Sequence, residues 1–283
     1  MKSLHDTFTL WNGVKIPILG FGTWNIANSA HAASIVRNAI EVGYRHIDTA
    51  EAYGNEESVG EGVKQSGVKR EELFITSKLW NTEHGYDKTM AAFEISMQKL
   101  QLEYMDLFLI HWPNPIAFRN NWQEANAGTW KAFEELYKAG RIRSIGLSNF
   151  RIHHIEELMK TATVAPMVNQ IRLCPGETQD ELVAYNREHT ILIEAYSPLG
   201  TGKIFKVSEM QKLAEKYNKS IAQIAIRWSL QMGYLPLPKS TNPERVLENT
   251  KVFDFALEEA DVQFLASLKG VAGESQNPDM TNF

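Results

Sequence analysis

The chain has 283 residues, of which 43% are hydrophobic and 22% charged, a balance typical of globular proteins that bury a large core. The formal net charge of −5 argues against nucleic acid as the main partner, and no apolar stretch approaches the ~20 residues that span a bilayer. The single cysteine, Cys174, excludes an internal disulfide, and the first residues lack the apolar core of a secretion signal. We therefore expect a cytoplasmic enzyme or binding protein with no nucleic-acid or membrane partner.

The segment 8–19 near the N-terminus reads FTLWNGVKIPIL. Its Asn12-Gly13 pair lies between two short apolar runs, a pattern typical of a tight turn between antiparallel strands. We expect a β-hairpin here that caps one end of the fold.

Eight short runs rich in β-branched and aromatic residues follow along the chain. Each is continuously apolar rather than alternating, as buried parallel strands are. The predicted strands cover residues 19–23, 45–50, 73–78, 105–111, 143–148, 167–171, 191–197 and 235–240.

Helical patterns separate these strands, with apolar residues three or four positions apart. The pattern Ser220-x-x-Gln223 is a capping box that opens one helix, and Thr178-x-x-Glu181 predicts a second box before the seventh strand. A last short helix is expected near 258–268.

The alternation of strands and helices, without a flexible linker, favours an α/β fold: a (β/α)8 TIM barrel that forms one domain over residues 1–283. An open, doubly wound sheet is the alternative, because alternation alone does not distinguish the two. In a barrel, the long loop predicted at 113–127 would lie at the active-site face. The irregular C-terminal segment 270–283 is either disordered or folded over the mouth of the active site.

Four ionisable side chains lie at or near the ends of consecutive predicted strands. Asp48 ends the second strand, with Tyr53 shortly after it, and Lys78 and His111 end the third and fourth. Because the carboxyl ends of barrel strands share one rim, we expect these groups to converge there.

Together these groups would make a proton donor. Tyrosine is a weak acid at neutral pH, and a neighbouring Lys78 would lower its pKa. Asp48 would keep Lys78 charged, and His111 would orient a carbonyl oxygen. Each residue alone also fits a structural role, as a helix cap, a packing residue or a solvated charge. The hydride for a carbonyl reduction must come from a cofactor, since no side chain supplies one.

Long, ordered sequence blocks carry a family resemblance. GYRHIDTAEAYGNE, TSKLW, LIHWP, IGLSNF, an NQ pair followed by a proline, and PKSTNPERVLEN resemble the signature blocks of the aldo-keto reductase superfamily. The resemblance covers nearly the whole chain and is nearest to the bacterial branch of glyoxal, methylglyoxal and 2,5-diketo-D-gluconate reductases. It implies a monomeric barrel that reduces aldehydes and ketones with NADPH, a C-terminal loop over the active-site mouth, and a catalytic tetrad of Asp48, Tyr53, Lys78 and His111.

The resemblance also implies a cofactor site. Asn242 is a predicted N-cap and Pro243 a first helical residue, so a helix N-terminus there could attract an anion. The resemblance makes that anion the 2′-phosphate of NADPH. The implied cofactor contacts run from the nicotinamide end through the pyrophosphate to the adenine: Gly22, Thr23, Ser148, Asn149, Gln170, Tyr196, Ser197, Leu199, Lys239, Ser240, Arg245, Glu248 and Asn249.

Four tryptophans would line an apolar substrate pocket, although packing under loops is their alternative role. Three are close to strand ends and one is in the long loop: Trp24, Trp80, Trp112 and Trp122. The chain departs from the family after Gln170, where the common NQVEFHP becomes NQIRLCP, with Arg172 and Cys174 at the changed positions. No second dinucleotide motif and no metal-ligand cluster is evident.

The alternative function is a non-catalytic barrel that binds NADPH as a sensor or a structural protein. Loss of a tetrad residue would be its natural sign, and the sequence has all four.

Overall fold

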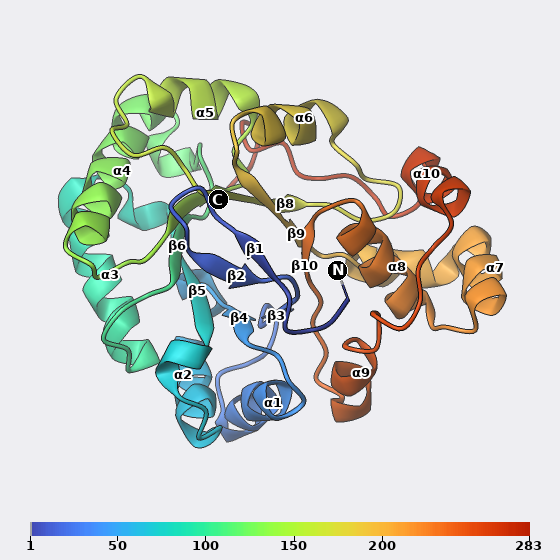
Figure 1. The fold of residues 1–283 in the computed structure, drawn as a ribbon. Helices are drawn as coiled ribbons and strands as arrows, with labels where there is room; N and C mark the ends of the chain where they lie inside the picture. The colour runs from blue at the N-terminus through green and yellow to red at the C-terminus, as the bar shows by residue number, and fades with distance from the viewer. Residues whose placement is uncertain (1) are drawn as a thin grey trace.

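The computed structural model describes residues 2–283 and shows eight parallel strands surrounded by helices (Figure 1). The strands follow one another in chain order from β3 to β10, and Gly22 N–H donates to the carbonyl oxygen of Pro238 at 3.0 Å, which joins the first strand to the last. The predicted (β/α)8 barrel is therefore confirmed, and the open sheet is excluded. The strands are β3 (Gly20–Gly22), β4 (His46–Asp48), β5 (Phe74–Leu79), β6 (Leu107–Ile110), β7 (Ile145–Ser148), β8 (Val168–Arg172), β9 (Leu192–Tyr196) and β10 (Leu235–Leu237).

Helices cover the outside of the ring (Figure 1); the first eight connect successive strands, and the last two follow the final strand. They are α1 (Ala30–Glu41), α2 (Glu56–Gln65), α3 (Tyr86–Leu100), α4 (Trp122–Lys138), α5 (Ile152–Met159), α6 (Asp180–Glu188), α7 (Ser208–Tyr217), α8 (Ile221–Gln231), α9 (Pro243–Glu248) and α10 (Glu259–Ser267). Short 3-10 turns η1 to η5 lie in the connections, of which η1 (Glu51–Tyr53), η4 (Ile116–Phe118) and η5 (Gly200–Lys206) bear on the site. Within residues 2–283, no helix has the length and apolar content needed to cross a bilayer.

The core explains why the strands read as continuous apolar runs. Every residue of β6 is fully buried, because one face points into the barrel and the other meets the helix layer. Phe108 packs against Phe93 of α3 and Phe133 of α4, with ring centroids 5.4 and 4.9 Å away. Such rings each contribute roughly 1.5–3 kcal/mol by burial, so the strands that carry the polar rim rest on a rigid apolar layer.

The predicted N-terminal hairpin is confirmed. Strands β1 (Thr7–Thr9) and β2 (Lys15–Pro17) pair antiparallel and cross the middle of the ring (Figure 1). Gly13 has a φ of 86°, which the turn between them requires. The Trp11 indole N–H donates to the carbonyl oxygen of Pro166, just before β8, so the hairpin covers the end of the barrel where the strands begin.

Two local predictions are corrected. The capping box Ser220–Gln223 forms at α8, but the box Thr178-x-x-Glu181 does not. The residue before α6 is Gln179, which has a left-handed φ of 46° and donates its amide to the carbonyl oxygen of Arg172 instead. The predicted loop 113–127 is shorter than expected, because α4 already begins at Trp122.

The C-terminal segment 270–283 contains no helix or strand and returns to the mouth of the barrel. Ile116 N–H of η4 donates to the carbonyl oxygen of Phe283 at 3.1 Å. Glu274, Gln276 and Phe283 line the same cavity as the strand-end residues. The predicted loop over the active-site mouth is therefore confirmed.

Candidate active site

The four strand-end residues converge on one rim of the barrel. Parallel pairing of β4 with β5, and of β5 with β6, brings Asp48, Lys78 and the residue after β6, His111, to the same end. Tyr53 reaches this rim from η1, whose first residue follows shortly after β4. Asp48, Tyr53 and His111 line one cavity, whereas Lys78 is fully buried behind it.

Lys78 connects the other members of this group. Its ammonium donates to Asp48 Oδ1 at 2.7 Å, to the carbonyl oxygen of Thr49 at 2.8 Å and to Tyr53 Oη at 3.3 Å. Three donors thus meet three oxygens, and the buried ammonium is fully satisfied. The Tyr53 ring lies edge-on to the imidazole of His111, with centroids 5.9 Å apart.

The protonation states follow from burial and charge. Burial lowers the pKa of Lys78, but the neighbouring Asp48 carboxylate and Tyr53 outweigh it, so its net pKa is raised and the ammonium keeps its charge. Burial, helped by the Lys78 cation, holds the pKa of His111 well below its usual range. His111 therefore meets the cavity as a neutral imidazole.

The expected direction for Tyr53 is wrong. Burial raises the pKa of Tyr53 by more than the Lys78 cation and its hydrogen bond lower it, and the Asp48 charge raises it further. We expected Lys78 to dominate, but complete burial of the phenol penalises the phenolate more strongly. Tyr53 is consequently a protonated phenol at neutral pH.

The rim opens into a cavity of about 1350 Å³ that runs from Tyr53 to α9. Most of the residues singled out in the sequence line it: Gly22, Asp48, Tyr53, His111, Ser148, Asn149, Gln170, Tyr196, Ser197, Leu199, Lys239, Ser240, Arg245, Glu248 and Asn249, together with Trp24, Trp80 and Trp112. Residues predicted near separate strand ends and on the helix after the last strand thus line one continuous cavity.

Besides Lys78, two of the predicted site residues do not line the cavity. Thr23 is buried, and its hydroxyl donates to the backbone oxygen of Asp48 at 3.0 Å, so it supports the rim from behind. Trp122 opens α4 and lies edge-on to His154, with centroids 4.9 Å apart. The structure therefore places Trp122 beside the two histidines of α5 and outside the predicted substrate pocket.

A hydrogen-bonded group of amides and hydroxyls forms part of the cavity wall. Ser148 Oγ donates to the backbone oxygen of Gln170, and Asn149 Nδ2 donates to Ser148 Oγ and to the backbone oxygen of His111. The Tyr196 hydroxyl donates to Asn149 Oδ1 at 2.8 Å. Asn149 and Ser197 adopt left-handed φ values of 62° and 50°, a strain that the surrounding hydrogen bonds hold in place.

At the far end of the cavity, the cap of α9 is as predicted, with a consequence for anion binding. Asn242 Oδ1 accepts from the backbone N–H groups of Glu244 and Arg245. These donors are therefore already engaged, and an anion would meet the side chains of Lys239 and Arg245 rather than the helix end.

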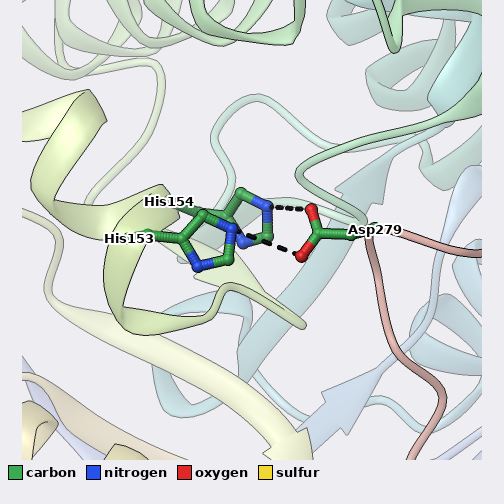
Figure 2. Close-up of side chains that lie close together, drawn as sticks. All are labelled: His153, His154 and Asp279. Atoms are coloured by element: carbon green, nitrogen blue, oxygen red, sulfur yellow. Dashed lines mark hydrogen bonds and ion pairs between the residues drawn. The ribbon is translucent and has the colours of Figure 1, made fainter.

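Side chains hold the C-terminal segment in place. Asp279 faces two neighbouring histidines of α5 (Figure 2): Oδ1 is 2.9 Å from His154 Nε2, and Oδ2 is 3.3 Å from His153 Nε2. The Arg151 backbone N–H donates to His154 Nδ1, so Nε2 carries the proton and donates to Asp279. Although partial burial opposes it, the amide of Asn114 and the two histidines hold the pKa of Asp279 below its usual range.

Arg172 makes a second attachment of this segment. Its guanidinium donates to the carbonyl oxygens of Ala272 and Gly273, and Glu177 lies 4.0 Å away. The departure noted in the sequence at this position therefore serves to hold the C-terminal segment. Cys174 is a buried side chain, and burial raises its pKa to about 11.

Sequence reasoning missed several residues of the site. Phe283 stacks on Trp80, with centroids 6.0 Å apart, and lies edge-on to Trp112 at 5.1 Å. No periodicity could place it, because it ends an irregular segment. Glu194 of β9, fully buried beside Gln170, was also missed; an acid inside an apolar strand was the signal that could have found it.

Comparison with known proteins agrees with this geometry. The family model described as "Aldo/keto reductase family" matches residues 18–269. The chain is 48% identical over 277 residues to glyoxal reductase of Bacillus subtilis (strain 168), covering 98% of each protein. It is 44% identical over 276 residues to methylglyoxal reductase DkgA of Escherichia coli (strain K12), covering 97% of this chain and 96% of that protein.

The chain belongs to the aldo/keto reductase family. Among solved structures, a Gox0644 mutant crystallised in complex with NADPH superposes on this aldo/keto reductase with a TM-score of 0.89 and 38% sequence identity. The match covers 98% of this chain and 99% of that chain. The resemblance inferred from the sequence blocks is thereby confirmed.

Proposed function

We propose that this aldo/keto reductase reduces aldehydes and ketones to alcohols with NADPH, and that Tyr53 donates the proton. The observation that carries the proposal is the buried ammonium of Lys78, which donates to both Asp48 Oδ1 and Tyr53 Oη at the wall of the cavity. The glyoxal and methylglyoxal reductases among its relatives make small 2-oxoaldehydes the first substrates to try.

The residues along the cavity fit NADPH. Lys239 and Arg245 offer two cations where a 2′-phosphate would lie, and Asn249 Oδ1 beside them is buried without a hydrogen-bond partner within residues 2–283. That open acceptor suits the amino group of an adenine. At the other end, Asn149 and Gln170 present amide groups to the cavity. When bound, NADPH supplies the hydride.

The chain's own residues would handle the proton and the substrate. Tyr53 holds its proton at neutral pH, because burial raises its pKa, and it faces the cavity. Neutral His111 can donate a hydrogen bond to a carbonyl oxygen without competing as an acid. As the oxygen gains negative charge, the fixed Lys78 ammonium stabilises the phenolate that Tyr53 becomes.

The aromatic wall would select the substrate. Trp24, Trp80, Trp112 and Phe283 line the cavity beside Tyr53 and His111. They leave an apolar space that suits small or aromatic carbonyl compounds. We also propose that the protein acts as a monomer, because one chain supplies the rim, the cavity and the covering segment.

The test is the loss of NADPH absorbance with a panel of carbonyl compounds that includes glyoxal, methylglyoxal and benzaldehyde. The proposal expects turnover of at least one of them and binding of NADPH in their absence. Binding of NADPH with no turnover of any carbonyl would contradict it and would favour a non-catalytic role.

A further inference from the structure

A buried side-chain amide lies between two acidic side chains beneath the rim. Gln170 of β8 donates both N–H groups of Nε2, one to Asp48 Oδ2 and one to Glu194 Oε2, each at 2.8 Å. Asp48 is 3% exposed, Gln170 2% and Glu194 not at all. The amide thus joins β4, β8 and β9 across the barrel.

This arrangement defines the orientation of the Gln170 amide. An amide nitrogen has two N–H groups, and both are used here. A flipped amide would place Oε1 against Asp48 Oδ2, a carboxylate oxygen that offers no donor. Oε1 therefore lies on the side away from the carboxylates, while Gln170 lines the cavity.

Glu194 is energetically unfavourable at this position, because burial penalises its ionised form. Burial, followed by the nearby Asp48 charge, raises the pKa of Glu194 to about 8. Its Oε1 lies 3.7 Å from His46 Nε2, and burial lowers the pKa of that histidine to about 3, so His46 supplies no positive charge. The Gln170 hydrogen bond and the Lys78 cation lower the pKa of Glu194, but by less than burial raises it. A hydrophobic side chain on β9 would fill the same space without this cost.

We infer that Glu194 is a positioning residue for the cofactor's nicotinamide: it holds the Gln170 amide so that only the acceptor Oε1 is offered to the carboxamide N–H. The inference rests on the proposed function, since it requires NADPH in the cavity. It gives Glu194 a part in recognition through Gln170, without contact to cofactor or substrate.

The arrangement predicts selectivity between two closely related cofactors. A carboxamide has an N–H group for Gln170 Oε1, whereas the acetyl group of 3-acetylpyridine adenine dinucleotide phosphate has none. The native protein should bind reduced NADPH about fivefold more tightly than the reduced acetylpyridine analogue, the value of one hydrogen bond. Without Glu194, one N–H of Gln170 can turn to the cavity and donate to the acetyl oxygen, so the preference should fall below about twofold.

The experiment measures the dissociation constants of both cofactors, by fluorescence, for the native protein and two variants. Glu194→Met removes the acceptor and keeps the length of the side chain, so it should lose the preference. Glu194→Gln keeps an acceptor oxygen and should retain it. If Glu194→Met does not fold, Glu194→Val, which suits a strand, carries the same prediction.

The outcomes separate the two proposals. Failure of the native protein to bind NADPH would overturn the proposed function. Tight NADPH binding together with a preference that Glu194→Met or Glu194→Val leaves intact would overturn the role of Glu194 alone. Equal losses of affinity for both cofactors in the variant would also overturn it, because a purely structural residue would act on both alike.

Discussion

The strand-end rim and the C-terminal segment meet at one cavity but are held in different ways. The rim consists of buried ionisable groups at the ends of neighbouring strands, whose parallel register brings Lys78 within 2.7 Å of Asp48. The segment 270–283 has no regular structure and depends on attachments such as Asp279 to the α5 histidines and Arg172 to Ala272. The difference teaches that backbone register holds the proposed chemistry, whereas side-chain contacts and a backbone hydrogen bond between η4 and Phe283 hold the cover over it.

The largest effect should come from a change in the rim. Lys78→Met would leave the Asp48 carboxylate buried without its cation and the Tyr53 phenolate without stabilisation. We expect turnover to fall about 100-fold or more, and the free energy of unfolding to fall by about 3–5 kcal/mol. Steady-state kinetics and urea unfolding would measure both, with the exposed Lys88→Met as control. Turnover within twofold of native would contradict the role of Lys78.

A change at the far end of the cavity should affect affinity without affecting chemistry. Arg245→Ala removes an exposed cation that lines the cavity. NADPH should bind about tenfold more weakly, whereas NADH, which lacks the 2′-phosphate, should be little affected. Titration of both cofactors tests this, with exposed Lys251→Ala as the matched control. Equal weakening of NADPH and NADH would mean that Arg245 does not meet the phosphate.

Loosening the C-terminal segment should have a smaller effect, which should appear in KM for the substrate rather than in kcat or cofactor affinity. Asp279→Ala removes the carboxylate that faces both His153 and His154 and so releases the residues that carry Phe283 to Trp80. We expect KM for aromatic aldehydes to rise about threefold to tenfold while kcat and NADPH affinity stay near native.

Asp254→Ala, which breaks the Lys219 ion pair away from the cavity, is the control for this change. A fall in kcat with KM unchanged would show that the segment takes part in the chemistry, and the comparison between the two regions would fail.

The smallest effect on turnover should come from Glu194→Gln, which should instead alter the pH dependence of stability. The carboxyl of Glu194 faces His46, Asp48, Lys78 and Gln170. Its folded pKa is raised from 4.5 to about 8, so the unfolded chain releases this proton first and native stability falls as pH rises through that window.

The glutamine variant lacks this loss, which amounts to at most about 1.4 kcal/mol per pH unit. Urea unfolding at intervals from pH 5 to pH 8 should therefore show the variant gaining stability relative to the native protein. Parallel curves would mean that Glu194 is ionised in the fold.

Much of the fold could be predicted because short stretches of neighbouring residues determine it. Buried strands such as β6 are short apolar runs, and the ends of such runs place Asp48, Lys78 and His111 on one rim. The cap of α8 and the turn at Gly13 likewise depend on a few neighbouring residues.

What could not be predicted depends on contacts between distant residues. The net direction for the pKa of Tyr53 needs the extent of burial, which no strand pattern provides. The bridge from Gln170 to Glu194 crosses neighbouring strands inside the barrel, and the position of Phe283 follows from side-chain attachments of an irregular segment. Trp122 has the same apolar character as Trp80, and only the early start of α4 turns it toward His154.

The most direct test of the central claim is Tyr53→Phe, measured for both NADPH binding and a single turnover of a carbonyl substrate. This variant keeps the ring that packs against His111 and removes only the hydroxyl bonded to Lys78. The account predicts an NADPH dissociation constant within about twofold of native and a rate of reduction at least about 100-fold lower. Reduction at the native rate would show that another group donates the proton.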